Sequence, residues 1–201
     1  MKTKNLMNKA LCMLIAAAGI ALSLSSCGGQ KKQAEQVPEE DSIVVLVAYF
    51  SATGTTRKVA KLMEENFACD VVEIKPAQPY TEADLDWKDK QSRSTLEMND
   101  STARPAIEPM DIDLSKYELI YLGYPIWWGV APRVINTFLE TYDLKGIEII
   151  PFCTSGGSPV EPSVEALRKQ YPDYHFQDGL LLNNVGEDGL IAPEEDTTEA
   201  E

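Results

Sequence analysis

Histidine, cysteine and basic side chains are scarce in this chain of 201 residues. It has one histidine and four cysteines, and no two cysteines stand at C-x-x-C spacing, which excludes a zinc ribbon and leaves little material for any metal site. Lysine and arginine together number 18, against 32 aspartate and glutamate residues, so the formal net charge is −14. Because a phosphate backbone repels such a chain, we expect no nucleic-acid partner.

The composition is otherwise that of a globular protein with one domain. Hydrophobic residues make up 44% and charged residues 25% of the chain, which excludes a disordered or collagen-like protein. The length suffices for one domain and is too short for two of ordinary size.

The first 26 residues have the pattern of a lipoprotein signal peptide. Three lysines and no acidic residue precede the apolar run Ala10–Leu24, which is too short to span a bilayer comfortably. Leu24-Ser25-Ser26-Cys27 then resembles a bacterial lipobox, in which Cys27 becomes the lipidated first residue of the mature chain. The alternative is an ordinary signal peptide with an incidental cysteine.

The lipobox predicts a membrane partner and a location. We expect a lipid-anchored protein of the Gram-negative cell envelope, in the outer membrane facing the periplasm, because Gly28 rather than aspartate follows Cys27. The signal has no Arg-Arg pair, so we expect export of an unfolded chain and acquisition of any cofactor outside the cytoplasm. Residues 27–42 are polar and predict a flexible tether, and residues 186–201, with seven acidic residues and no basic one, predict an acidic tail.

Residues 43–185 alternate between apolar runs and amphipathic segments, which predicts an α/β domain with a parallel sheet. Five apolar runs predict strands: Ile43–Phe50, Val71–Ile74, Glu118–Gly123, Glu148–Cys153 and Gly179–Leu182. Three amphipathic segments predict helices: Thr56–Phe67, Pro132–Tyr142 and Pro159–Tyr171. Ligands of such sheets bind beyond the carboxyl ends of the strands, so the loops at that edge are the candidates for a site.

The first loop at that edge, Ser51-Ala52-Thr53-Gly54-Thr55-Thr56, has the features of an anion cradle. Its four hydroxyls and its glycine adjoin the exposed amides of a helix N-terminus. It has neither the lysine of a Walker loop nor the G-x-G-x-x-G pattern, so it suits one monophosphate better than a triphosphate with Mg²⁺. A polar turn with ordinary threonine capping is the alternative.

Two further loops lie at the same edge. Tyr124-Pro125-Ile126-Trp127-Trp128-Gly129 carries adjacent tryptophans, which favour a flat aromatic ligand stacked on indole, although a tryptophan pair folded onto a neighbouring helix is the alternative. Thr154-Ser155-Gly156-Gly157-Ser158 has paired glycines that let backbone amides approach a ligand, and a simple helix-start loop explains it equally well. Together the three loops describe a pocket for a phosphorylated planar heterocycle.

The combined pattern Y-P-I-W-W-G…P-F-C-T-S-G-G-S resembles that of flavodoxins, most closely a short flavodoxin-like bacterial family. The resemblance runs from Ile43 to about Leu182. It implies a flavodoxin-like three-layer α/β sandwich with a five-stranded parallel sheet in the order 2-1-3-4-5, and FMN as cofactor. The last helix of that fold is expected to be missing, because residues 183–201 have no apolar helical face.

The resemblance also implies roles for the three loops, none of them catalytic. The FMN phosphate would lie against the first loop, at Ser51, Thr53, Gly54, Thr55 and Thr56. The ring and the ribityl chain would lie along the second loop, at Pro125, Ile126, Trp127, Trp128 and Gly129. The pyrimidine edge would lie against the third loop, at Thr154, Ser155, Gly156 and Gly157. One of the two indoles would stack on the isoalloxazine. The implied function is electron transfer or NAD(P)H-dependent reduction of quinone-like acceptors, and the alternative is a non-enzymatic binding lipoprotein without flavin.

Residues 76–113 form a long polar stretch where the family has its second helix. Four of its side chains are candidates to cover the flavin or to meet an electron donor: Tyr80, Trp87, Arg93 and Arg104. An ordered lid without a chemical role is the alternative.

The remaining chemistry-bearing residues receive structural roles. His175, placed before the last strand, is given no catalytic role. In the implied strand order, Cys69 and Cys153 stand at opposite ends of strands that are three spacings apart, about 14 Å. A disulfide needs Cα atoms within about 7 Å, so we predict two free thiols.

Overall fold

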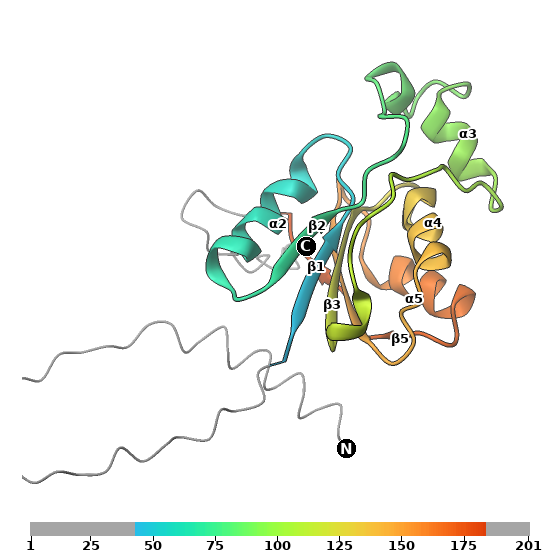
Figure 1. Ribbon diagram of the computed structural model, residues 1–201. Coiled ribbons are helices and arrows are strands. Elements are labelled where there is room, and N and C mark those ends of the chain that lie inside the picture. The colour runs from blue at the N-terminus through green and yellow to red at the C-terminus, as the bar shows by residue number, and fades with distance from the viewer. Residues whose placement is uncertain (1–42, 184–201) are drawn as a thin grey trace, which may run out of the picture. The chain divides into compact units, whose positions relative to one another are not determined.

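The computed structural model describes residues 43–183, which form a parallel sheet between helices. The strands follow the order β2-β1-β3-β4-β5, as the resemblance implied, and every pairing is parallel (Figure 1). The four longer strands are β1 (Val45–Tyr49), β2 (Asp70–Glu73), β3 (Leu119–Pro125) and β4 (Glu148–Thr154).

The fifth position of the sheet is occupied by two short strands rather than one. β5 (His175–Phe176) pairs with the start of β4, and β6 (Leu180–Leu181) pairs with its end. The expected strand Gly179–Leu182 is therefore only the second of the two, and His175 belongs to the sheet instead of preceding it. At the break, a Cβ on Gly179 would stand 2.6 Å from a methyl group of Val160 and 2.7 Å from one of Val164, so the close approach of the chain to the preceding helix requires glycine.

Helices cover both faces of the sheet, which makes the three layers. α2 (Thr55–Asn66) lies on one face, and α4 (Arg133–Thr141) and α5 (Glu161–Gln170) lie on the other (Figure 1). The larger core joins the sheet to α4 and α5, with Ile120, Leu122 and Phe138 fully buried in it. All three expected helices are present, with bounds shifted by one or two residues at each end.

The polar stretch after β2 is an ordered excursion with its own helices. It contains the short 3₁₀ helix η1 (Ala83–Leu85) and α3 (Arg93–Asn99), and a second 3₁₀ helix, η2 (Leu114–Lys116), leads into β3. An antiparallel bridge between Pro76 and Ile107 brings the two ends of the excursion together. α3 lies beyond the carboxyl ends of the strands, where ligands of such sheets bind (Figure 1).

Several predictions made from the sequence fall outside the described residues 43–183. These are the signal peptide, the lipidation site Cys27, the tether, the acidic tail and the missing last helix. Within residues 43–183, no helix has the length and apolar character needed to cross a membrane.

Candidate functional site

The first loop turns directly from β1 into α2 and leaves the start of that helix free for an anion. Gly54 adopts φ 93°, in the region that favours glycine, and its amide donates to Ser51 Oγ at 3.1 Å. No side chain of the described residues caps α2, and its first turn has no acidic residue. The amides and the positive end of the helix dipole therefore face the loop without competition from a carboxylate.

The threonines of this loop divide into two kinds. Thr56 is buried and its hydroxyl lies 2.9 Å from that of Thr154, so it ties the first loop to the third. We call this pair the threonine clamp. Thr53 and Thr55 lie at the surface with their hydroxyl oxygens 3.4 Å apart. The exposed pair is thus the part of the loop that can contact a ligand directly, while the clamp fixes its position.

The third loop is held by its own hydrogen bonds and by a residue that the sequence analysis missed. The amides of Gly157 and Ser158 donate to Ser155 Oγ at 3.1 and 2.7 Å. The Ser155 amide donates to Asn183 Oδ1 at 2.7 Å. Asn183 follows the fifth strand position, and its place at the carboxyl edge is the signal that would have identified it.

The second loop contains a tight turn with strained backbone. Trp127 and Val130 exchange two backbone hydrogen bonds of 3.0 Å, and the residues between them, Trp128 and Gly129, have φ of 48° and 80°. Two positive φ values in succession are the pattern of a type I′ turn. Among residues 43–183, Trp128 is the one residue other than glycine with positive φ. A bulky side chain in this region costs on the order of 1–3 kcal/mol, and such strain gathers at functional sites.

The turn separates the two indoles. Trp127 lies edge-on to Phe50 at 5.7 Å and to Tyr80 at 5.4 Å between ring centroids, so it packs against the core and against the excursion. Trp128 is 48% exposed. The alternative of a tryptophan pair folded onto a neighbouring helix does not describe this arrangement, because Trp127 packs against residues outside the helices and Trp128 stays exposed. Trp128 is the indole that is free to meet a ligand face.

The three loops line one cavity of about 680 Å³, which we call the loop cavity. All of its lining residues are uncharged in the described chain, and they are Thr53, Thr55, Thr56, Pro125, Ile126, Trp127, Thr154, Ser155, Gly156, Gly157 and Asn183. Of the predicted site residues, Ser51 and Gly54 shape the first loop, and Trp128 and Gly129 form the turn. The structure therefore brings the three predicted loops together at one place.

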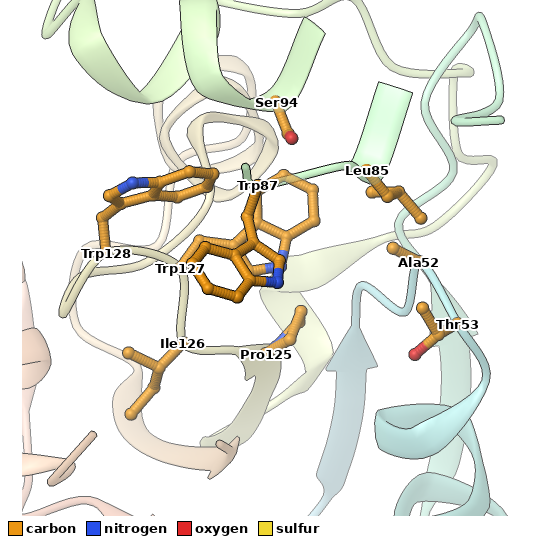
Figure 2. Close-up of a pocket in the computed structure, with 9 residues that line it drawn as sticks. All are labelled: Ala52, Thr53, Leu85, Trp87, Ser94, Pro125, Ile126, Trp127 and Trp128. Atoms are coloured by element: carbon orange, nitrogen blue, oxygen red, sulfur yellow. The ribbon is translucent and has the colours of Figure 1, made fainter. Parts of the chain in front are cut away.

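A second cavity of about 390 Å³ adjoins the first and shares Thr53, Pro125, Ile126 and Trp127 with it. We call it the tryptophan cavity. Its other lining residues are Ala52, Leu85, Trp87, Ser94 and Trp128 (Figure 2). Trp87 is one of the four side chains of the excursion that were candidates to cover the flavin, and it lines this second cavity.

The other three candidates of the excursion have structural partners. Tyr80 donates its hydroxyl hydrogen to Glu97, and burial together with that carboxylate raises the pKa of Tyr80, so the phenol stays protonated. Arg93 lies 4.2 Å from the centre of the Tyr80 ring and pairs with Glu97 at 2.7 Å. Arg104 forms a two-point ion pair with Glu140 on α4, at 2.7 and 2.8 Å.

Both cysteines of the described residues are free thiols, as predicted. Burial raises the pKa of Cys153 to about 12. Burial, followed by the charge of Glu64, also raises the pKa of Cys69. Neither thiol is therefore activated as a nucleophile or metal ligand. Within residues 43–183 no group of three potential metal-binding side chains is found.

The strand order and the three loops at the carboxyl edge define a doubly wound α/β protein of the flavodoxin-like fold, with its candidate site at the switch point between β1 and β3. Residues 44–194, about three quarters of the chain, match a family model described as flavodoxin. The chain belongs to the flavodoxin family. The comparison with the curated proteins finds no significantly similar sequence.

Solved structures agree with this assignment. A candidate flavoprotein from Bacteroides eggerthii DSM 20697 is 50% identical, with a TM-score of 0.70, over 73% of this chain and 92% of that one. A candidate flavoprotein from Bacteroides uniformis ATCC 8492 is 49% identical, with a TM-score of 0.70, over 73% and 94%. A flavoprotein from Lactobacillus acidophilus NCFM, solved in complex with FMN, is 25% identical with a TM-score of 0.57, over 70% and 93%.

Proposed function

We propose that this chain binds FMN in the loop cavity and works as an electron-transfer protein or as a reductase of quinone-like acceptors. The proposal rests on one observation. The uncapped start of α2, the exposed Thr53 and Thr55, and the tryptophan turn all lie around one uncharged cavity. The FMN complex of the Lactobacillus acidophilus flavoprotein supports it, since that protein matches 70% of this chain.

The residues present fit the phosphate of FMN. The chain has a net charge of −14, and yet no carboxylate lines the loop cavity in the described structure. A phosphate monoester at the start of α2 would accept hydrogen bonds from backbone amides and from Thr53 and Thr55, and the helix dipole favours its charge. A lining without acidic side chains among the described residues is what an anion site in an acidic protein requires.

The remaining loops fit the rest of the cofactor. Pro125 and Ile126 give an apolar wall for the ring, an indole can stack on it, and the Ser155–Gly157 backbone and Asn183 offer polar groups for the pyrimidine edge. Bound FMN supplies the redox chemistry itself. The chain binds it, orients it and sets its electrostatic surroundings, which are acidic overall and therefore lower its reduction potential.

We also propose that the protein is anchored by a lipid on Cys27 in the Gram-negative envelope, at the periplasmic face of the outer membrane. The lysine-rich start, the apolar run and the lipobox support this location. Labelling cells with a tagged palmitate tests it. The label should enter the wild-type protein and be lost in Cys27→Ser, and a Cys27→Ser protein that still takes up label at the membrane would contradict it.

The FMN proposal is tested with residues 28–201. The domain folds within this part, because the matched region of this chain covers 92% of the Bacteroides eggerthii chain. We expect FMN fluorescence to be quenched on titration with sub-micromolar affinity, and Trp127→Ala/Trp128→Ala to weaken binding at least tenfold. Phe67→Ala, at the far end of α2, is the matched control and should bind as the wild type does. If the protein quenches the fluorescence of neither FMN nor riboflavin, it is better described as a binding lipoprotein without flavin.

A further inference from the structure

The outermost strand on one side of the sheet is β2, and within residues 43–183 it pairs with β1 alone (Figure 1). The Ile74 amide, just after β2, donates to the Tyr49 carbonyl oxygen of β1 at 2.7 Å. Because alternate residues of a strand bond to the same neighbour, the backbone groups of Val71 and Glu73 point away from β1. These outward amides and carbonyls face the side on which no described strand lies.

The chain that returns from the excursion starts to pair with this outer edge and then leaves it. The Glu108 amide donates to the Lys75 carbonyl oxygen at 2.8 Å. The next residue, Pro109, has no amide hydrogen. The amide of Met110 is directed elsewhere and donates to the Tyr142 hydroxyl at 2.9 Å. The return chain therefore leaves the edge of β2 open, and an open edge is a template for another strand.

A groove of about 730 Å³ is lined by both β2 and the return chain, and we call it the edge groove. Half-buried apolar side chains line it from both segments, with Val71 and Val72 on β2 and Met110 and Ile112 on the return chain. An extended peptide is the ligand that uses both features. Its backbone adds a strand to the edge, while its alternate side chains contact the walls.

The charge of the edge groove defines the chemistry of its partner. Two lysines line the groove, against six acidic residues: Glu64, Asp70, Glu73, Glu108, Asp111 and Asp113. Three of these carboxylates are exposed and have no ion-pair partner within residues 43–183: Glu64, Glu108 and Asp111. A second copy of the chain would bring the same excess of negative charge to the edge, and like charges brought together in an interface are unfavourable. A peptide rich in lysine or arginine meets no such repulsion.

We propose that the edge groove binds an extended segment of another protein, in which basic residues alternate with apolar ones, as an added strand beside β2. Val71 and Glu73 supply the backbone hydrogen bonds, the apolar side chains of the segment lie against Val72 and Met110, and its cations lie beside the unpaired carboxylates. The inference does not rest on the FMN proposal, because no residue of the edge groove lines the loop cavity.

Fluorescence anisotropy of a labelled heptapeptide of alternating lysine and valine, titrated with residues 28–201, tests the proposal. We expect one-to-one binding that weakens as salt is added and that saturating FMN leaves unchanged. Two further versions of the peptide carry N-methyl groups on the lysine amides or on the valine amides. Since only one of these sets faces β2, only one version should lose binding, by at least about tenfold. Equal binding by all three peptides would overturn the added strand.

Two triple variants separate the edge groove from the general acidity of the chain. The groove variant should weaken binding at least about tenfold, and it is Glu64→Gln/Glu108→Gln/Asp111→Asn. The matched control removes three carboxylates outside the groove and should weaken binding less than about threefold, and it is Glu65→Gln/Glu82→Gln/Glu161→Gln. Equal losses in the two variants would overturn the proposal.

Amide hydrogen exchange followed by NMR identifies the strand directly. In the free protein, the amides of Val71 and Glu73 should exchange at least about tenfold faster than that of Val72, and saturating peptide should slow both at least about tenfold. Peptide binding without this protection would overturn the proposal. Protection that rises with protein concentration in the absence of peptide would show that a second copy covers the edge, and it would also overturn the proposal. Peptide binding by a chain that takes up no FMN would support the edge groove and overturn the flavin alone.

Discussion

The threonine clamp provides a quantitative prediction about how the site is built. Thr56 and Thr154 are 1% and 4% exposed, and their hydroxyl oxygens lie 2.9 Å apart. Replacing either one with valine keeps the shape and leaves the other hydroxyl buried without its partner. Such an orphaned group costs about 1–3 kcal/mol. Each single variant should therefore lose about that much free energy of unfolding.

The double variant should lose much less than the sum of the two singles. In Thr56→Val/Thr154→Val both partners are apolar, and replacement of a whole hydrogen-bonded pair is nearly neutral. We expect a coupling energy of at least about 1 kcal/mol in the cycle. Urea unfolding followed by tryptophan fluorescence measures it. The exposed pair Thr53 and Thr55, 3.4 Å apart, is the control and should show no coupling. Additive losses at the buried pair would refute the reasoning.

Three further predictions concern the sheet, a thiol and the acid stability. Gly123→Ala would place a Cβ 2.1 Å from Cζ of buried Phe152. The variant should lose about 3 kcal/mol of the free energy of unfolding, measured with urea, and a loss below about 1 kcal/mol would contradict this. The second prediction concerns Cys153, whose pKa is raised to about 12 by burial. In a Cys69→Ser variant at pH 8, Cys153 should react with a disulfide reagent at least about 100-fold more slowly in the folded protein than after unfolding. Equal rates would contradict this. The hydrogen bond with its arginine partner lowers the pKa of Glu140, so its contribution to stability is present above the ordinary glutamate pKa of about 4.3 and lost as the pH falls. Glu140→Gln should thus be less stable than the wild type at pH 7 and converge with it in acid, and a difference that persists at pH 2 would contradict this.

The central fold was predictable because its signals are local. The long apolar runs of β1, β3 and β4 identify strands buried on both faces, and α4 has an apolar face over its whole length. The strand order came from the resemblance of the loops, since periodicity alone does not order a sheet. β5 was missed because two residues cannot show a period.

The parts of the site that escaped prediction depend on tertiary contacts. α3 has seven residues and begins at a serine cap, and its short sequence shows no clear apolar face. The burial of Ser94 depends on how α3 lies against η1 and the rest of the fold, and the sequence has no local signal for that placement. The choice between Trp127 and Trp128 depends on a turn in which Trp128 and the glycine after it have positive φ. The sequence alone did not show that this turn is there. Asn183 is the exception, because it directly follows the predicted strand Gly179–Leu182 and its place at the carboxyl edge could have identified it.

In our proposal, the start of α2 together with Thr53 and Thr55 recognises the phosphate of FMN. The most direct measurement is the affinity of residues 28–201 for FMN and for riboflavin, which lacks the phosphate, in the wild type and in Thr53→Ala/Thr55→Ala. Charge-assisted hydrogen bonds contribute about 1.5–3 kcal/mol each, so the wild type should bind FMN at least about 100-fold more tightly than riboflavin. The variant should lose at least about tenfold of that preference and keep its riboflavin affinity. Equal affinity of the wild type for FMN and riboflavin would contradict the claim.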